Sequence, residues 1–317
     1  MVEKQEVTHS KMRYIYKSPN LKITNTMSNL ERSYTKILSV LQQLNHQSNF
    51  LEQIRIPKLS DLEVIALILT AEYLNVDSER ELFRRLPERL STCIERSVYH
   101  RRKKRLFFYI ESLRTQMAEQ MTLGEDHFII DSMPLEVCKM SRSNRSTICC
   151  EDIQTSPNHG YCASQQMHFY GYKLHAVCSS TGVFKHFDLT PASVHDIHYL
   201  NDLKDLMSDC DLNGDKGYLS HQVQVDLFRS SNIKLHVPMR KNQSNYKVLP
   251  WVMRKTRKRI ETLFSQLCDQ FMIRRNYAKS FKGFATRVLA KLTALTTIQW
   301  INHLEKRNIN NLKIKIA

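Results

Sequence analysis

The stretch His127-Phe128-Ile129-Ile130-Asp131, followed by Ser132-Met133-Pro134, decides the fold of this chain. It is a short apolar run that ends in an acid, which is typical of a buried strand that delivers a carboxylate at its end. Residues 167–178 alternate as a second strand, residues 179–182 are a turn signal, and residues 183–189 form a third strand. These segments therefore predict the first half of a sheet, in which the second and third strands form a hairpin.

Two more strands follow, and each is accompanied by a helix. The predicted elements are a helix over 197–207, a strand over 211–215, a helix over 219–229 and a strand over 233–237. The fourth strand ends at a second acid, Asp215, and Gly217 allows a sharp turn behind it. Asp196 is expected to cap the first of these helices, and His195 is a candidate for the surroundings of a site. The order β-β-β-α-β-α-β-α predicts a mixed α/β sheet whose first and fourth strands are neighbours.

On the N-terminal side of this core, residues 1–125 are predicted to be a helical region, with a helix within 28–54. A capping box of Ser60 with Glu63 opens a second helix, and a similar box at Ser78 opens a third. Two helices with so short a link resemble a helix-turn-helix unit that reads DNA. The same geometry is common in ordinary helix bundles, so both interpretations stay open.

On the C-terminal side, a polar, basic loop precedes a long helix over 251–276, and a final helix covers 280–303. Residues 126–305 are assigned to one α/β domain that includes both helices. Residues 306–317 form a tail, and its part from Asn308 onward is expected to be loosely held.

Positive charge is concentrated at one end of the chain. The 317 residues carry 47 Lys and Arg against 31 Asp and Glu, a net charge of +16. Residues 1–130 contribute +4, residues 131–238 contribute −3, and residues 239–317 contribute +15. Such a concentration favours a polyanionic partner, because basic side chains displace counterions from phosphates. A solvated basic face that aids solubility is the alternative, and charge by itself does not separate the two.

A second basic run, Arg101-Arg102-Lys103-Lys104-Arg105, is predicted to lie at the start of a helix. Consecutive cations at a helix start are unfavourable against the helix dipole, and an anionic partner would relieve them. A run of solvated side chains is the alternative.

Other classes of protein are excluded or disfavoured by the sequence. It contains no run of about 18 apolar residues, which excludes a membrane-spanning protein. No secretory signal is expected at the N-terminus, so the eight cysteines are expected to be reduced thiols of a cytoplasmic protein. Cys149, Cys150, His159 and Cys162 lack the paired spacing of simple zinc sites, which disfavours zinc.

Three acids, Asp131, Asp215 and Glu261, are the candidate catalytic residues. The predicted sheet brings the first two together, and the long helix packed across the sheet edge adds Glu261. Clustered carboxylates raise one another's pKa unless cations bind. Two Mg²⁺ or Mn²⁺ ions would fit, since they can activate an attacking hydroxyl and stabilise the leaving oxygen of a phosphodiester. Taken singly, each acid has a plain structural alternative: a turn, a strand end, or an ion pair of Glu261 with Arg257.

Four segments carry a resemblance to a known family. They are Phe128-Ile129-Ile130-Asp131-Ser132-Met133-Pro134, Gly171-Tyr172-Lys173-Leu174-His175, Gly214-Asp215-Lys216-Gly217-Tyr218 and Arg257-Lys258-Arg259-Ile260-Glu261-Thr262-Leu263-Phe264-Ser265. They resemble the DDE transposases of bacterial insertion sequences, most of all the group named nine-eight-two. The resemblance implies a ribonuclease-H-like core in which Asp131, Asp215 and Glu261 are the metal-binding acids.

The resemblance also implies a function. A DDE transposase binds the terminal inverted repeats of its element and catalyses metal-dependent cleavage and strand transfer on double-stranded DNA. Cutting two ends implies a homodimer or a higher oligomer on DNA. A DNA-binding derivative without catalysis, and a nuclease that stops at cleavage, are the alternatives.

The chain departs from a Tyr–Arg–Glu–Lys signature that some related families carry around the glutamate. Arg257 and Glu261 match its middle, but Arg254 replaces the tyrosine and Cys268 replaces the lysine. Contacts to DNA are therefore assigned to other basic residues. These are Arg254, Arg257, Lys258, Arg274 and Arg275, together with Arg101, Arg102, Lys103, Lys104 and Arg105.

Overall fold

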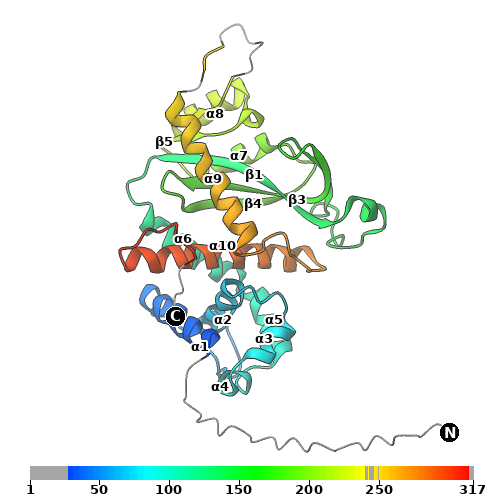
Figure 1. The fold of residues 1–317 in the computed structure, drawn as a ribbon, viewed down its shortest axis with the longest axis vertical. Coiled ribbons are helices and arrows are strands. Elements are labelled where there is room, and N and C mark those ends of the chain that lie inside the picture. The colour runs from blue at the N-terminus through cyan, green and yellow to red at the C-terminus, as the bar shows by residue number, and fades with distance from the viewer. Residues whose placement is uncertain (1–27, 240–241, 243–245, 249, 314–317) are drawn as a thin grey trace, which may run out of the picture.

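The computed structural model describes residues 28–239, 242, 246–248 and 250–313. A sheet with helices on both faces lies above a group of N-terminal helices (Figure 1). The predictions for residues 1–27, for 314–317 and for part of the 240–250 loop lie outside the described residues. Within these residues, none of the helices combines the length and apolar character needed to cross a lipid bilayer.

The sheet is mixed and, within the described residues, has six strands. They are β1 (His127–Cys138), β2 (Asn158–Cys162), β3 (Met167–Ser179), β4 (Phe184–Pro191), β5 (Cys210–Asn213) and β6 (Ile233–His236). β3 lies antiparallel to β1 along one edge and to β2 and β4 along the other, while β1, β5 and β6 run parallel. This order confirms the predicted pairing of the first strand with the strand that precedes Asp215, and the architecture is consistent with a ribonuclease-H-like α/β fold.

Two features of the sheet differ from the sequence prediction. β1 continues past Asp131 to Cys138, so Asp131 lies within the strand and not at its end. Pro134 does not stop β1, because β1 pairs with β5 only as far as Ile129 and leaves its edge open beyond that point among the described residues. β2 was not among the predicted strands; its residues are mostly exposed, so no apolar alternation marks it.

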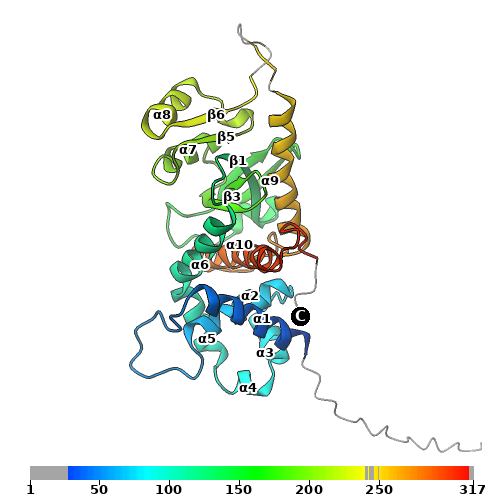
Figure 2. The ribbon, with the colours of Figure 1, turned by 90° about the vertical axis from the view of Figure 1, so that its left-hand side faces the viewer.

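Helices cover both faces of the sheet (Figure 2). One face carries η2 (Asp196–His198), α7 (Tyr199–Leu203), η3 (Lys216–Tyr218) and α8 (His221–Ser231), and the other carries α9 (Trp251–Asp269) and α10 (Phe281–Leu304). A hydrophobic core lies on each face of the sheet. Successive residues of β1 belong alternately to the two cores, because successive side chains of a strand point to opposite faces. Ile130 packs with the α7 and α8 side, and Ile129 belongs to the core shared with α9 and α10.

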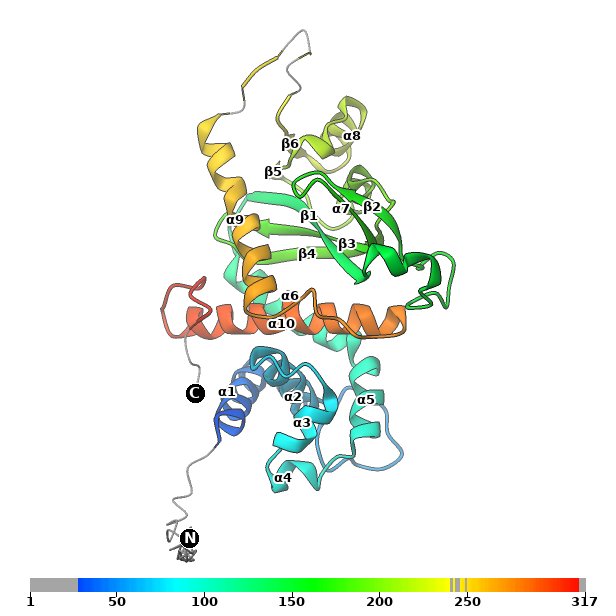
Figure 3. The same cartoon turned by 45° about the vertical axis from the view of Figure 1, so that its right-hand side comes forward.

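Most of the N-terminal helices lie on the side of α10 away from the sheet (Figure 3). The N-terminal helices are α1 (Asn29–Leu44), α2 (Asp61–Tyr73), α3 (Glu79–Arg85), α4 (Glu88–Ser91), α5 (Arg96–Arg105) and α6 (Phe107–Met121); the short η1 (Met140–Arg145) follows β1. Of these, α2, α5 and α6 contact α10, and α6 also reaches β4 of the sheet. α10 is buried along most of its length because it lies between these helices and the sheet. One hydrophobic core runs through both parts, and the domain boundary at residue 125 stays a prediction.

Two helix predictions are wrong at their ends. The basic run Arg101 to Arg105 forms the last turns of α5 and not a helix start, so its charge is favourable to the dipole. α9 ends at Asp269 rather than at residue 276. Met272 takes a left-handed conformation (φ 49°), and the Ile273 N–H donates to the Leu267 carbonyl at 3.0 Å, which turns the chain back into the core.

Two helices are shorter than predicted, and the described part of the C-terminal tail is bound to the rest of the protein. The helix within 28–54 ends at Leu44, and the helix predicted over 197–207 is reduced to η2 and α7. The described part of the tail is held rather than loose. The Asn302 side chain donates to the Asn311 carbonyl at 2.9 Å, the Gln266 side chain donates to the Asn310 carbonyl at 3.0 Å, and Leu312 is buried.

Candidate active site

Asp131 lies on the sheet face that α9 crosses. It pairs with Ala176 of β3, two residues past the last pair that β1 makes with β5. Its neighbours on the same face, Ile129 and Met133, share a core with the buried side of α9. One carboxylate oxygen, Oδ1, accepts a hydrogen bond from the Ser132 N–H at 2.8 Å.

Asp215 follows directly after β5 in a tight turn. Its Oδ1 accepts a hydrogen bond from the Gly217 N–H at 2.7 Å and so begins the short helix η3. Gly217 leaves room for this carboxylate, because a Cβ placed there would lie 2.9 Å from Oδ1. The strand predicted to end at Asp215 ends at Asn213, so Asp215 lies in the turn behind it. Gly217 has no positive φ and serves the turn by leaving space, not by the backbone freedom expected from the sequence.

Glu261 reaches the same region from α9. The Asn213 side chain at the end of β5 donates to the Met253 carbonyl at 2.6 Å and to Thr256 Oγ1 at 3.0 Å, which fixes the helix to the sheet. The buried side of α9 consists of Ile260, Leu263, Phe264 and Leu267. Glu261 itself is exposed, and it forms no ion pair or hydrogen bond with another described residue. The alternative of an Arg257–Glu261 ion pair is therefore not realised in the structure.

The three carboxylates act on one another electrostatically. The pKa of Asp131 is raised to about 7, chiefly because burial disfavours its charged form. The hydrogen bond from Ser132 and the charge of Arg257 lower this pKa, while the charges of Asp215 and Glu261 raise it further. Asp131 thus senses both other acids, and the Arg257 guanidinium, whose buried Nε has no hydrogen-bond partner, lies among them.

The donor atoms of the site suit a hard divalent cation. Asp131 Oδ2, Asp215 Oδ2 and both oxygens of Glu261 accept no hydrogen bond from described residues, and carboxylate oxygens are the ligands that Mg²⁺ prefers. Within the described part of the chain, however, no three His, Cys, Asp or Glu side chains are grouped closely enough to hold an ion by themselves. Mg²⁺ usually keeps several waters and takes few protein carboxylates, so the acids fit as a partial ligand set.

A fourth acid beside the site was not singled out as functional from the sequence. Asp196 Oδ1 accepts from Lys173 Nζ of β3 at 2.9 Å, and its Oδ2 lies 3.5 Å from the position of a Cβ on Gly217. The expected cap role is wrong for Asp196, since His195 caps η2 by accepting from the Ile197 N–H at 3.3 Å. The sequence offered one signal for a buried acid near this strand, which was the charged Lys173 in a mostly apolar segment.

The basic residues proposed to touch DNA fall into two groups. On α9, Arg254 and Lys258 are exposed and Arg257 is partly buried next to the acids. Arg274 and Arg275 lie beyond the end of α9, and Arg275 Nη1 is 3.6 Å from the Asp77 carboxylate. The charge of Arg257 acts on Asp131, whereas Arg274 and Arg275 lie outside α9.

Two residues of the α5 run are buried and face acids of α2. Arg102 is buried, where it pairs with Asp61 at 2.5 Å and donates to the Leu59 carbonyl at 2.8 Å. Lys103 is buried with its Nζ 3.7 Å from the Glu72 carboxylate. The expectation of surface DNA contacts by Arg102 and Lys103 is therefore wrong, while Arg101, Lys104 and Arg105 keep some exposure.

Comparison with known proteins gives one match. The family model described as a transposase DDE domain matches residues 122–297, which include β1, the turn after β5 and α9, and so all three acids. No curated protein and no solved structure matches the chain.

Proposed function

Because the chain belongs to the DDE transposase family, we propose that it moves an insertion sequence by binding the terminal inverted repeats of the element and by cutting and joining DNA strands there. The observation that supports this proposal is the match of the family model across β1, the turn after β5 and α9, which carry Asp131, Asp215 and Glu261. The charges of the other two acids also raise the pKa of Asp131. Assignment to the group named nine-eight-two belongs to the same proposal and rests on the sequence segments alone.

The proposed chemistry has two phosphoryl-transfer steps. In the first, a water oxygen bonds to the phosphorus at the end of the element, and the bond from phosphorus to the 3′-oxygen breaks, which leaves a 3′-hydroxyl. In the second, that hydroxyl bonds to a phosphorus of the target DNA and displaces a target 3′-oxygen. The bond formed in the second step replaces the bond broken, so neither a covalent enzyme intermediate nor a nucleotide is needed.

The residues of the site have separate tasks in these steps. Two Mg²⁺ or Mn²⁺ ions, held by Asp131, Asp215 and Glu261, would supply activation of the attacking oxygen and stabilisation of the leaving oxygen. Asp131 has to be ionised to act as a ligand, and because burial raises its pKa to about 7, a bound cation would have to stabilise its charged form. Arg257 lies where its guanidinium can hold the scissile phosphate, with Arg254 and Lys258 on flanking phosphates.

Substitution of the acids tests the proposal. We expect Asp131→Asn, Asp215→Asn and Glu261→Gln each to lower strand cleavage by at least about 10³-fold, while binding to DNA changes little. Duplexes taken from the DNA that flanks the gene serve as substrates, with Mg²⁺ or Mn²⁺, and gel analysis separates cleaved from joined products. Asp269→Asn is the matched control, because this exposed acid lies at the end of the same helix.

The outcomes also decide between the alternatives. Full cleavage by any of the three variants contradicts the assignment of that acid. Cleavage without joining by the wild-type protein favours a nuclease that only hydrolyses, and binding without cleavage favours a silent DNA-binding derivative. A homodimer or a higher oligomer on DNA is part of the proposal, because two ends have to be cut together.

A further inference from the structure

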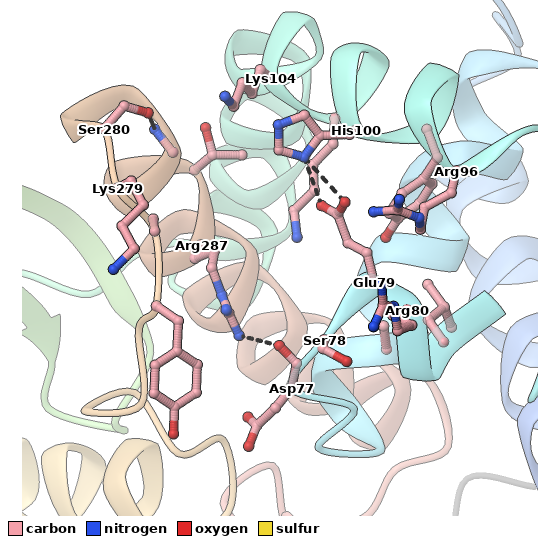
Figure 4. A pocket seen from close by; sticks show the side chains of 18 of the residues that line it. Asp77, Ser78, Glu79, Arg80, Arg96, His100, Lys104, Lys279, Ser280 and Arg287 are labelled. Carbon is pink, nitrogen blue, oxygen red and sulfur yellow. Dashed lines mark hydrogen bonds and ion pairs between the residues drawn. The ribbon is translucent and has the colours of Figure 1, made fainter. Parts of the chain in front are cut away.

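A cavity of about 950 Å³ lies away from the three acids, between the N-terminal helices and the start of α10 (Figure 4). One wall comes from α2, α3 and α5, and the other from residues 277–287 together with the β1–β2 loop. The two walls therefore belong to distant parts of the chain that meet here.

Cations face the cavity from both walls. On the side of α3 and α5 they are Arg80, Arg96, Lys103 and Lys104, and on the side of α10 they are Lys279 and Arg287. Figure 4 shows Lys279 and Arg287 across the cavity from Arg80 and Arg96, with Lys104 near its rim. Four of these cations, Arg80, Arg96, Lys104 and Lys279, form no side-chain ion pair or hydrogen bond with a described residue.

Each acid of the cavity wall already has a partner, and the four acids are outnumbered by the six Lys and Arg side chains of the lining. Glu72 pairs with Lys291 at 2.6 Å, and Glu79 pairs with His100 at 3.0 Å. Asp77 is 3.6 Å from Arg275, and Glu151 accepts from the backbone N–H of Phe281. The cations that line the cavity are thus left with a surplus of positive charge.

Two cations in the wall, the buried Lys103 and the partly buried Arg287, are incompletely paired. Lys103 is 9% exposed, and its one ion pair, with Glu72 at 3.7 Å, is longer than a hydrogen bond. Burial and the neighbouring charges of Arg287 and Lys291 lower the pKa of Lys103, although Glu72 opposes this. The Nε of Arg287 is buried without a hydrogen-bond partner, while its Nη2 donates to the Asp77 carbonyl at 2.9 Å. An anion in the cavity would relieve both groups.

We propose that this cavity binds backbone phosphate of the DNA on which the protein acts, between Lys104 on α5 and Lys279 with Arg287 beside α10. The proposal rests on the proposed function for the identity of the polyanion. A chain of phosphates fits better than a single free one, because six cations from two walls line the cavity and more than one phosphate group can be paired there. Bound DNA would then connect the N-terminal helices to the catalytic body through contacts to both walls.

The test measures DNA affinity against salt concentration for full-length protein and a duplex of arbitrary sequence, with EDTA present. Each phosphate contact contributes a slope of about 0.9 to the plot of log affinity against log salt. The double variant Lys104→Gln/Lys279→Gln is expected to flatten this slope by about two units. Lys234→Gln, an exposed and unpaired cation on β6, is the matched control and is expected to leave the slope close to that of the wild type.

Lysine acetylation with mass-spectrometric readout gives the second measurement. The duplex is expected to protect Lys104 and Lys279 but not Lys234. Protection by pyrophosphate and not by the duplex would overturn the assignment to DNA in favour of a free phosphate compound. Protection by neither, or an unchanged slope in the double variant, would overturn the site itself.

The two proposals fail in distinguishable ways, because binding is measured without divalent metal. A protein that shows the flattened slope but no metal-dependent cleavage keeps the cavity site and loses the proposed function. A protein that cleaves DNA but shows an unchanged slope in the double variant keeps the function and loses the cavity site.

Discussion

At the scale of single residues, the Asp215 turn depends on a glycine for a steric reason. A Cβ on Gly217 would lie 2.9 Å from Asp215 Oδ1 and 3.5 Å from Asp196 Oδ2, although the backbone there does not require glycine by its φ angle. Because Gly217 has no side chain, it leaves room for the Asp215 carboxylate in its observed position. Asp196, which lies on the other side of Gly217, is held by Lys173, whose Nζ donates to Asp196 Oδ1 at 2.9 Å.

Gly217→Ala is expected to impair catalysis more than folding. The added methyl group has to displace the Asp215 carboxylate by a fraction of an ångström, and misplacement on the order of 1 Å costs about 10²-fold in rate. The measurements are the rate of metal-dependent cleavage and the temperature of thermal unfolding. Lys216→Ala, at an exposed position of the same turn, is the control. Wild-type cleavage by Gly217→Ala, or loss of its folded structure, would contradict this account.

At the scale of elements, the hairpin of β3 and β4 carries a histidine that is held neutral. Burial lowers the pKa of His186 to about 4, and the charges of Arg114 on α6 and of Lys185 act in the same direction. Arg114 reaches this edge by donating to the carbonyls of Phe184 at 2.8 Å and Lys185 at 3.0 Å. The hairpin is thus held against α6 by a buried cation that also disfavours protonation of His186.

His186 is expected to make the protein less stable in acid. Its unfolded pKa is about 6.5, so between pH 6.5 and about 4 the unfolded chain binds more protons and stability falls as the pH falls. His186→Leu should flatten the dependence of the unfolding free energy on pH by up to about 1.4 kcal/mol per pH unit in this window. Urea unfolding across the pH range measures it. The same slope in the variant and the wild type would show that His186 does not titrate in this way.

The sequence predicted the bounds of helices and strands well where the local pattern of apolar residues and caps is strong. β3 and α10 were predicted almost to the residue, because their apolar content is high and caps such as Ser280 mark their ends. β2 was missed because it is exposed, and the end of α9 was misplaced because the turn at Met272 depends on packing by Phe271 and Ile273. β2 and the end of α9 are determined by contacts with distant parts of the chain, which the local sequence does not reveal.

At the candidate site, too, the sequence predicted what depends on strand order and missed what depends on contacts between distant residues. The strand order predicted the pairing of β1 with β5, the strand before Asp215, and this pairing is confirmed. The roles of Asp131 and Asp215 stay a prediction. The burial of Arg102 and Lys103 could not be predicted, because their partners Asp61 and Glu72 lie on another helix. The same limit applies to Asp196, whose partner Lys173 comes from β3.

At the scale of the whole molecule, α10 joins the sheet to the N-terminal helices. A buried pair of Lys291 on α10 with Glu72 on α2 lies within this junction at 2.6 Å, and Lys291 also donates to the Phe271 carbonyl at 2.7 Å. Separation of the two parts would leave a buried cation without its acid, which costs about 3–5 kcal/mol, and would expose the apolar side of α10.

We therefore expect the chain to unfold in one transition. Circular dichroism and fluorescence of Trp300, on α10, should give the same midpoint in urea. A fragment of residues 126–313 should be unfolded or aggregated, because α10 loses the partners that α2 and α6 supply. A soluble fragment with its own cooperative transition would contradict this prediction and would favour an independent domain that begins near residue 126.

The position of α10 also has a consequence for synthesis on the ribosome. α2 is buried on nearly all sides, yet α10, one of the helices against which it packs, is made more than 200 residues later in the chain. The nascent N-terminal helices must remain incompletely folded, and open to chaperones, until translation has passed α10. Glu261 is also made late, so a chain still being translated carries two of the three acids and an unfinished core. Cleavage by this protein would then begin only after translation has passed both segments, which keeps unfinished chains from cutting DNA.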